Sequence, residues 1–145
     1  MITMDSSLEA IHKEALQRQA RQKVDLIDEL RAALNADRRG IPQRDIADLL
    51  ATSQARVHRL LKAIERRGGT VNKDPEEIIL RAFAYDTSRQ RLMEELMSYT
   101  YTFGEQAPYP HEGRIPGTWD QVVKAFAQGL LTKGEFDQIR TAVGR

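Results

Sequence analysis

Two short amphipathic patterns, at 42–50 and 54–66, lie on either side of three turn residues, and this arrangement constrains the fold more than any other feature of the chain. Pro42 suits the first residue of a short helix, because its fixed φ fits that position and its missing N–H would have no partner there. Ser53 can accept hydrogen bonds from the free N–H groups that begin the second helix. The spacing therefore predicts a helix-turn-helix unit.

Apolar side chains recur at helical spacing in both patterns, so each helix is expected to bury one face. The residues predicted to face inward are Ile46, Ala47, Leu49, Leu50, Val57, Leu60, Leu61 and Ile64. Ala51 departs from the common pattern, because many such units have glycine at the first turn position. A left-handed conformation of Ala51 would cost about 1 kcal/mol.

The opposite face of the second helix carries Ala55, Arg59, Lys62 and Arg66, at about 100° per residue. Reading bases in the major groove of DNA requires short side chains near the helix N-terminus, so that the backbone can approach, and Gln or Arg that reach base edges. Gln54 suits an adenine and Arg59 a guanine, each worth roughly 1 to 3 kcal/mol of discrimination. The residues predicted to read bases are Ser53, Gln54, Ala55, His58, Arg59 and Lys62.

Positive charge is concentrated around this unit. The segment 37–73 has nine Lys and Arg against four Asp and Glu, a net charge of +5, whereas the whole chain has a net charge of +1. Such charge favours contact with DNA phosphates, which sets register without reading sequence. The residues predicted to contact phosphate are Arg38, Arg39, Arg44, Thr52, Arg56, Arg66 and Arg67. A charged helix exposed to solvent would show the same periodicity, but the Ser cap, the small residues and the local charge together favour double-stranded DNA as the partner.

Composition narrows the function classes further. The chain of 145 residues contains no cysteine, which excludes disulfides, thiolate metal sites and thiol nucleophiles. His12 has no partner at a metal-binding spacing, and no pattern indicates a metal, a cofactor or a small-molecule ligand. No apolar run approaches the roughly 20 residues of a membrane span, and the N-terminus has neither a basic start nor an apolar segment. We therefore expect a cytoplasmic protein with no membrane partner.

Before the helix-turn-helix unit, Ser6 and Glu9 form an S-x-x-E pattern that predicts a capping box and a helix to about Asn35. The second half of this helix is amphipathic and is expected to pack on the unit through Val24, Ile27, Leu30 and Leu34. The first half, from His12 to Lys23, is almost wholly polar. It is interpreted either as a solvated helix or as an arm that lies along DNA phosphate.

After the unit, Gly68 and Gly69 suit a helix stop, and they begin a predicted linker at 68–73. This linker divides an N-terminal DNA-binding domain at 1–67 from a C-terminal domain at 74–145. The alternating strands of a wing are not expected after the second helix, because the sequence offers only two suitable residues there.

The C-terminal domain is predicted to be helical. Asp74 and Glu77, on either side of a first-turn proline, predict the start of one helix, and a second helix after 86–88 is expected to end at Gly104. The segment 105–118 contains prolines and glycines and is interpreted as a long irregular loop. Two further helices, capped by Thr118 and Thr132, complete a small bundle. The fold class is all-α, with a helix-turn-helix domain joined by a short Gly-containing linker to a small helical domain.

This C-terminal half has two open interpretations. It binds a protein partner or a second copy, or it makes a second contact with DNA although it is net negative. The residues assigned to that second contact are Arg89, Arg91, Tyr109, His111, Arg114, Lys124 and Lys133.

The order of these parts resembles the immunity repressors of temperate phages that infect mycobacteria. The resemblance rests on IPQRDIADLLATSQARVHRLLKAI, on YTYTFG at 99–104 and on GTWDQVVKAFAQGLLTKGEF at 117–136. It implies a transcriptional repressor that keeps a prophage silent and so maintains lysogeny, by occupying an early promoter and many asymmetric operator sites. The sequence has no heptad run or long apolar helix that would form a dimer, which agrees with binding as a monomer.

Two other functions remain open at this point. An antitoxin or a host regulator would have the same helix-turn-helix, and its C-terminal half would bind a protein partner. An enzyme is not expected: a recombinase could use a tyrosine nucleophile, but the four tyrosines lack a surrounding set of Arg and His at a readable spacing.

Overall fold

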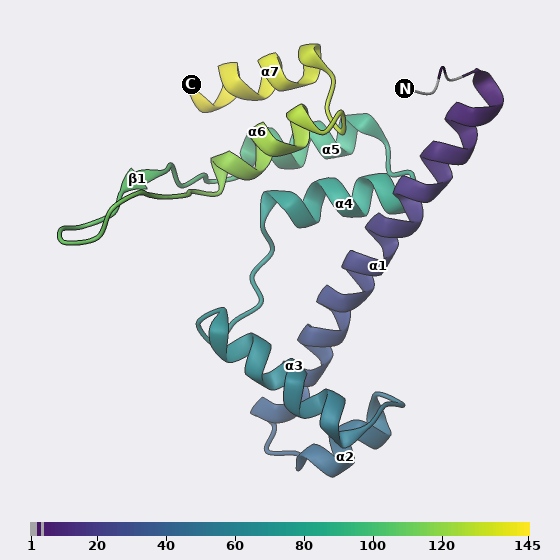
Figure 1. Ribbon diagram of the computed structural model, residues 1–145, viewed down its shortest axis with the longest axis vertical. Helices are drawn as coiled ribbons and strands as arrows, with labels where there is room; N and C mark the ends of the chain where they lie inside the picture. Colours follow the sequence, from purple (N-terminus) through teal and green to yellow (C-terminus); the bar gives the residue numbers. More distant parts are fainter. Residues whose placement is uncertain (1–2, 4) are drawn as a thin grey trace. The chain divides into compact units, whose positions relative to one another are not determined.

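The computed structural model describes Thr3 and residues 5–145, so the expectation about the N-terminus lies partly outside the described residues, at Met1, Ile2 and Met4. The chain is mostly helical, as predicted. Its described part forms seven helices and one two-stranded antiparallel sheet (Figure 1). In chain order the elements are α1 (Ser6–Arg38), α2 (Gln43–Leu49), α3 (Gln54–Arg66), α4 (Pro75–Tyr85), α5 (Arg89–Ser98), β1 (Glu105–Gln106), β2 (Arg114–Ile115), α6 (Trp119–Ala127) and α7 (Lys133–Val143).

The chain divides into two compact units. The α2–α3 unit is Gln22–Asn72, and the α4–α7 unit combines Lys73–Arg145 with the chain up to Arg21. This division differs from the predicted domain at 1–67, because α1 contributes its first half to one unit and its second half to the other.

The first half of α1 joins the α4–α7 unit through the C-terminal end of α4. The last carbonyl groups of a helix have no partner within it. Gln17 donates from Nε2 to the carbonyl oxygen of Phe83 at 3.5 Å, and Arg21 donates from Nη1 to that of Ala84 at 3.4 Å. A guanidinium is also favoured at this end by the helix dipole. The polar end of this segment therefore stabilises α4 instead of being simply solvated.

The start of α1 is capped differently from the prediction. The backbone N–H of Leu8 donates to Oδ1 of Asp5 at 2.9 Å, so Asp5 is the cap and Ser6 is already helical. The predicted capping box of Ser6 and Glu9 is thus wrong by one residue, because adjacent Asp and Ser are equally good N-caps. The helix continues to Arg38, a few residues beyond the predicted end.

Two adjoining clusters form the core of the α2–α3 unit. In one, Leu30, Ala33 and Leu34 of α1 pack on Leu60 and Ile64 of α3. In the other, Ile46, Ala47 and Val57 join α2 to α3. These contacts confirm most of the predicted inward-facing residues.

Leu49 is an exception, because its side chain is 66% exposed. The buried face of α2 is centred between Ile46, Ala47 and Leu50, and Leu49 lies roughly a third of a turn from that centre. The prediction that Leu49 faces inward is therefore wrong.

The glycines after α3 stop the helix as predicted, but the residues that follow are held on α1. Gly68 and Gly69 have φ of +87° and +88°, values that glycine adopts without strain. Arg38 donates to the carbonyl of Gly69 at 3.2 Å, and Arg31 donates to that of Val71 at 3.1 Å. The side chain of Val71 packs against the Leu30 cluster. The first part of the predicted linker is thus anchored to the α2–α3 unit.

One cluster, contributed by all four C-terminal helices, forms the core of the α4–α7 unit. Its buried members are Ile78, Ile79, Ala82, Leu92, Leu96, Tyr101, Val122, Ala125, Leu131 and Ile139. Predicted caps begin two of these helices: Asp74 accepts from the N–H of Glu77, and Thr132 and Glu135 form a reciprocal capping box. The predicted cap at Thr118 is wrong, because its hydroxyl accepts from the N–H of Thr102 and from no N–H of α6. Trp119 is partly buried against this core and stacks on Phe136.

The helix expected to reach Gly104 ends at Ser98 instead. Tyr99 has an extended backbone, and Tyr101 turns into the core, where its hydroxyl donates to the carbonyl of Leu96. The expected loop at 105–118 contains a hairpin, in which Glu105 pairs with Ile115 and Gln106 with Arg114.

Candidate nucleic-acid interface

The start of α3 is fixed by its cap and by the turn before it. The Ser53 hydroxyl accepts a hydrogen bond from the backbone N–H of Arg56 at 3.1 Å, as predicted. In the turn, Ala51 has φ of +55°, and the N–H of Thr52 donates to the carbonyl of Ala47 at 2.9 Å. Ala51 therefore adopts the left-handed conformation that favours glycine, at a cost of about 1 kcal/mol.

The outward face of α3 brings the predicted base-reading residues together. Val57, Leu60 and Ile64 are buried on the inner side of the helix. Exposed residues on the other side and at the cap are Ser53, Gln54, Ala55, His58, Arg59 and Lys62. Lys62 approaches Glu65 at 3.4 Å, an exposed pair of a kind that contributes little to stability. The helix thus presents a continuous surface on which the neighbours of Gln54 in sequence, Ser53 and Ala55, have short side chains.

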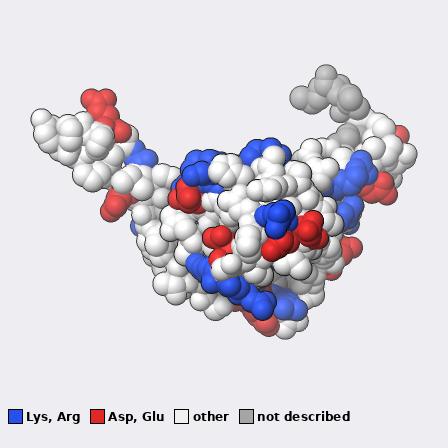
Figure 2. All heavy atoms as spheres, turned by 90° about the horizontal axis from the view of Figure 1, so that it is seen from below, with Lys and Arg blue, Asp and Glu red and all other residues white. Residues whose placement is uncertain are grey.

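Five of the arginines predicted to contact phosphate are exposed in the same unit: Arg38, Arg39, Arg44, Arg66 and Arg67. Thr52 is half-buried in the turn. Figure 2 shows one face of the molecule, on which Lys and Arg form several groups with Asp and Glu between them. On this face the positive charge does not form one uninterrupted patch.

Arg56 differs from the other predicted phosphate contacts, because its guanidinium has a carboxylate partner within the unit. Its Nε and Nη2 donate to the two carboxylate oxygens of Glu29 in α1, at 2.9 and 2.5 Å. This bidentate hydrogen bonding lowers the pKa of the Glu29 carboxyl below its ordinary value of 4.5, against the opposing effect of burial. The guanidinium of Arg56 is thus engaged by Glu29 in this structure, whereas its contact with phosphate stays a prediction.

Sequence reasoning missed Glu29. It lies 27 residues before Arg56, and its spacing to neighbouring residues in α1 gives no sign of a partner in α3. Only the packing of Leu30, the next residue, on Leu60 and Ile64 would have indicated that this part of α1 runs beside α3.

The arginines assigned to a second DNA contact are engaged in ion pairs within the α4–α7 unit. Arg89 donates from Nε to Glu135 at 2.8 Å and also binds the carbonyl of Leu130, so it ties α5 to the start of α7. Arg114 donates to Asp120 at 3.0 Å. These contacts give Arg89 and Arg114 a role in packing, and their assignment to a second DNA contact stays a prediction.

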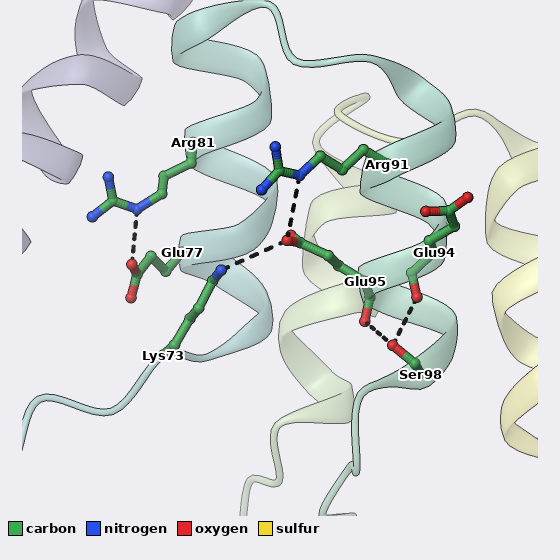
Figure 3. Close-up of polar contacts among 7 residues, drawn as sticks. All are labelled: Lys73, Glu77, Arg81, Arg91, Glu94, Glu95 and Ser98. Carbon is green, nitrogen blue, oxygen red and sulfur yellow. Dashed lines mark hydrogen bonds and ion pairs between the residues drawn. The ribbon is translucent and has the colours of Figure 1, made fainter.

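Arg91 lies on the polar face between α4 and α5, where it shares the carboxylate of Glu95 with Lys73 (Figure 3). Both N–O distances are 3.8 Å. On the neighbouring helix Arg81 binds the buried Glu77 at 2.8 Å. Cations and carboxylates therefore alternate along this face, which does not give Arg91 the unopposed charge that a phosphate contact requires.

The remaining residues of that set lie on separate elements. Tyr109, which is 98% exposed, and His111 lie in the loop that connects the two strands of the hairpin. Lys124 is exposed on α6, and Lys133 is the first residue of α7. The structure thus brings the seven residues to no single surface comparable with the outward face of α3.

Tyr101, one of the tyrosines considered as a nucleophile, is buried in the core of its unit. Its hydroxyl donates to the carbonyl of Leu96, and burial raises the pKa of this phenol far above its ordinary value. Ionisation of Tyr101 is therefore disfavoured, which makes it a poor nucleophile.

The described residues contain neither a candidate metal site nor a helix that could span a membrane. No group of three or more His, Cys, Asp and Glu within them is placed to hold a metal ion. None of the helices they form has the length and apolar character to cross a membrane. Comparison of the chain with models of protein families, with curated proteins and with solved structures finds no match.

Proposed function

We propose that this protein is a sequence-specific DNA-binding repressor that places α3 in the major groove as a recognition helix. The observation that carries the proposal is the division of α3 into two faces. The inner face is fixed on the core by Val57, Leu60 and Ile64. The outward face and its edge carry the exposed side chains of Gln54, Ala55 and Arg59. A major groove about 12 Å wide admits a helix, provided that the side chains at its leading end are short.

The chemistry of the exposed face suits base recognition. Gln54 can form two hydrogen bonds with the N6 and N7 atoms of adenine, and Arg59 can form two with the O6 and N7 atoms of guanine. Ala55, between them in sequence, allows the helix backbone to approach and can contact a thymine methyl group. His58 lies about one turn and Lys62 about two turns after Gln54, and both extend the polar surface.

Arginines outside this face would hold the helix in register. Arg38 ends α1 and Arg39 follows it, Arg44 lies in the first turn of α2, and Arg66 ends α3 and is followed by Arg67. Phosphate contacts of this kind release counterions, so binding should weaken steeply with salt. We propose the predicted phosphate contacts with the exception of Arg56, because the guanidinium of Arg56 binds Glu29.

More specifically, we propose a phage immunity repressor, which binds asymmetric sites as a monomer and maintains lysogeny by occupying them. It rests on the resemblance of three sequence motifs. Equilibrium sedimentation of the protein with a duplex that carries one site tests the monomer: we expect a one-to-one complex, and a two-to-one complex would contradict it.

Binding isotherms of two arginine variants test the proposed function. Arg59→Ala should relax base preference at one position of the site, at a cost of roughly 1 to 3 kcal/mol for the preferred base. Arg67→Ala should weaken binding to all sequences similarly and reduce the salt slope by roughly one unit. If the two variants behave alike, base reading and phosphate binding are not divided between these residues as proposed.

A further inference from the structure

The ion pair of Arg56 and Glu29 joins the leading end of α3 to α1. Arg56 is the third residue of α3, and its own N–H donates to the Ser53 cap, so it belongs to the turn that would enter a groove first. Glu29 precedes Leu30, which is 2% exposed and packs on Leu60 and Ile64. The packing of Leu30 therefore fixes the backbone of Glu29, and the carboxylate of Glu29 binds Arg56 at the leading end of α3.

We infer that Glu29 is a positioning residue for DNA recognition, which sets the orientation of α3 through Arg56 and withholds the charge of Arg56 from phosphate. This inference rests on the proposed function. It adds a determinant of specificity that makes no contact with a base.

A bidentate pair can orient the helix where apolar contacts cannot. Packing of Val57, Leu60 and Ile64 determines which face of α3 is buried, but apolar attraction has no direction and tolerates small rotations of the helix. The two parallel N–H···O bonds of an Arg–carboxylate pair have defined geometry. Groups that read bases must be held within roughly 0.5 Å of their productive positions. The pair at Arg56 supplies such a constraint two residues after Gln54.

The same pair removes one positive charge from the surface available to DNA. Each phosphate neutralised by a free Lys or Arg contributes about −0.9 to the slope of log affinity against log salt. A guanidinium that is already neutralised by Glu29 contributes nothing to this slope. Affinity for DNA of any sequence is therefore lower than the number of arginines near α3 would give, and the preference for one site depends on how the pair orients α3.

Four variants of the full chain test this inference. Their binding is measured, over a range of salt concentrations, to a site that the wild-type protein selects from a random library of duplexes and to a duplex with the scrambled sequence of that site. Arg56→Gln should lower affinity for the site about tenfold and leave its salt slope unchanged. Glu29→Gln should steepen the slope by roughly one unit, because the released Arg56 can reach a phosphate, and it should reduce the preference for the site over the scrambled duplex. Arg67→Gln, a loss of a proposed phosphate contact, should reduce the slope by about one unit.

Glu65→Gln is the matched control. It adds the same charge as Glu29→Gln and also disrupts a pair on α3, but Glu65 is 68% exposed and its partner Lys62 lies on the same helix. We expect Glu65→Gln to raise affinity for both duplexes equally and to leave their ratio unchanged. Circular dichroism of each variant establishes that α3 is folded. If Arg56→Gln does not fold, Glu29→Gln decides, since it leaves every residue of α3 and the Ser53 cap unchanged.

Two results would overturn the inference while the proposed function stands. One is a loss of slope in Arg56→Gln equal to that in Arg67→Gln, which would make Arg56 a phosphate contact. The other is an unchanged preference for the site in both Glu29→Gln and Arg56→Gln, which would leave the pair a purely structural role. A wild-type protein that binds the two duplexes equally would instead refute the proposed function, and the inference with it.

Discussion

The Ser53 hydroxyl accepts a hydrogen bond from the backbone N–H of Arg56 at 3.1 Å, while the guanidinium of the same arginine binds Glu29. One residue therefore joins the cap of α3 to the neighbouring helix α1. The stability of this corner and the position of the proposed base-reading residues depend on the same few contacts.

Replacement of the cap should weaken the α2–α3 unit. Ser53→Ala removes the acceptor for one of the free N–H groups at the start of α3, and we expect a loss of about 1 kcal/mol in the free energy of unfolding. Ser6→Ala is the matched control, because Asp5 caps α1 in place of Ser6. Urea unfolding followed by circular dichroism measures both. Equal losses in the two variants would show that the Ser53 hydrogen bond does not stabilise the unit.

The turn before α3 should be improved by glycine. Ala51 has φ of +55°, so Ala51→Gly relieves a left-handed conformation and should raise the free energy of unfolding by roughly 0.5 to 1 kcal/mol. Ala55→Gly, inside α3, should lower it by a similar amount, since glycine is disfavoured in a helix. The unfolding midpoints of the two variants should thus move in opposite directions. A destabilised Ala51→Gly would contradict the strain assigned to this turn.

Two glycines at the base of the hairpin should differ in their tolerance of a methyl group. A Cβ at Gly117 would lie 2.4 Å from the carbonyl oxygen of Thr102, a backbone atom, whereas at Gly104 it would lie 2.2 Å from the guanidinium of Arg114. Because a side chain can move aside more easily than backbone, we expect Gly117→Ala to cost about 1 to 3 kcal/mol and Gly104→Ala less. Thermal unfolding measures the order, and a larger loss for Gly104→Ala would contradict it.

Acid should weaken the α4–α7 unit through Glu135. Hydrogen bonding to Arg89 holds the pKa of this carboxyl below its ordinary value of 4.5. The folded state therefore binds fewer protons than the unfolded state in this range, so the stabilisation is present above pH 4.5 and is lost as the pH falls through the folded pKa. Glu135→Gln can keep the capping box but removes the charge, and it should flatten the fall of unfolding free energy with pH. Arg89→Gln should have the same effect, and an unchanged profile in either variant would contradict the account.

The predictions that the structure confirms come from signals within a few residues. The caps at Ser53, Asp74 and Thr132 each lie three residues before the N–H that they accept, so sequence alone locates them. Helical periodicity also identifies most of the core. These signals are local, and their physics does not depend on where the rest of the chain lies.

The features that sequence reasoning missed depend on distant contacts or on weak local preference. Glu29 and Arg56 are 27 residues apart, and Gln17 and Phe83 are 66 apart. The hairpin strands have only two residues each and are exposed on both faces, so they show no alternation of apolar and polar residues. Apolar residues at helical spacing continue past Ser98 to Tyr99, so the sequence predicts a longer α5 than the structure shows. The helix ends at Ser98, because Tyr101 packs into the core.

Selection of bound duplexes from a random library tests most directly whether α3 reads DNA. The wild-type protein should enrich one asymmetric motif, and Gln54→Ala and Arg59→Ala should each lose preference at a different position of it. Arg67→Ala should enrich the same motif with lower yield. Enrichment of no common sequence by the wild type, or of an unchanged motif by both Gln54→Ala and Arg59→Ala, would contradict the account.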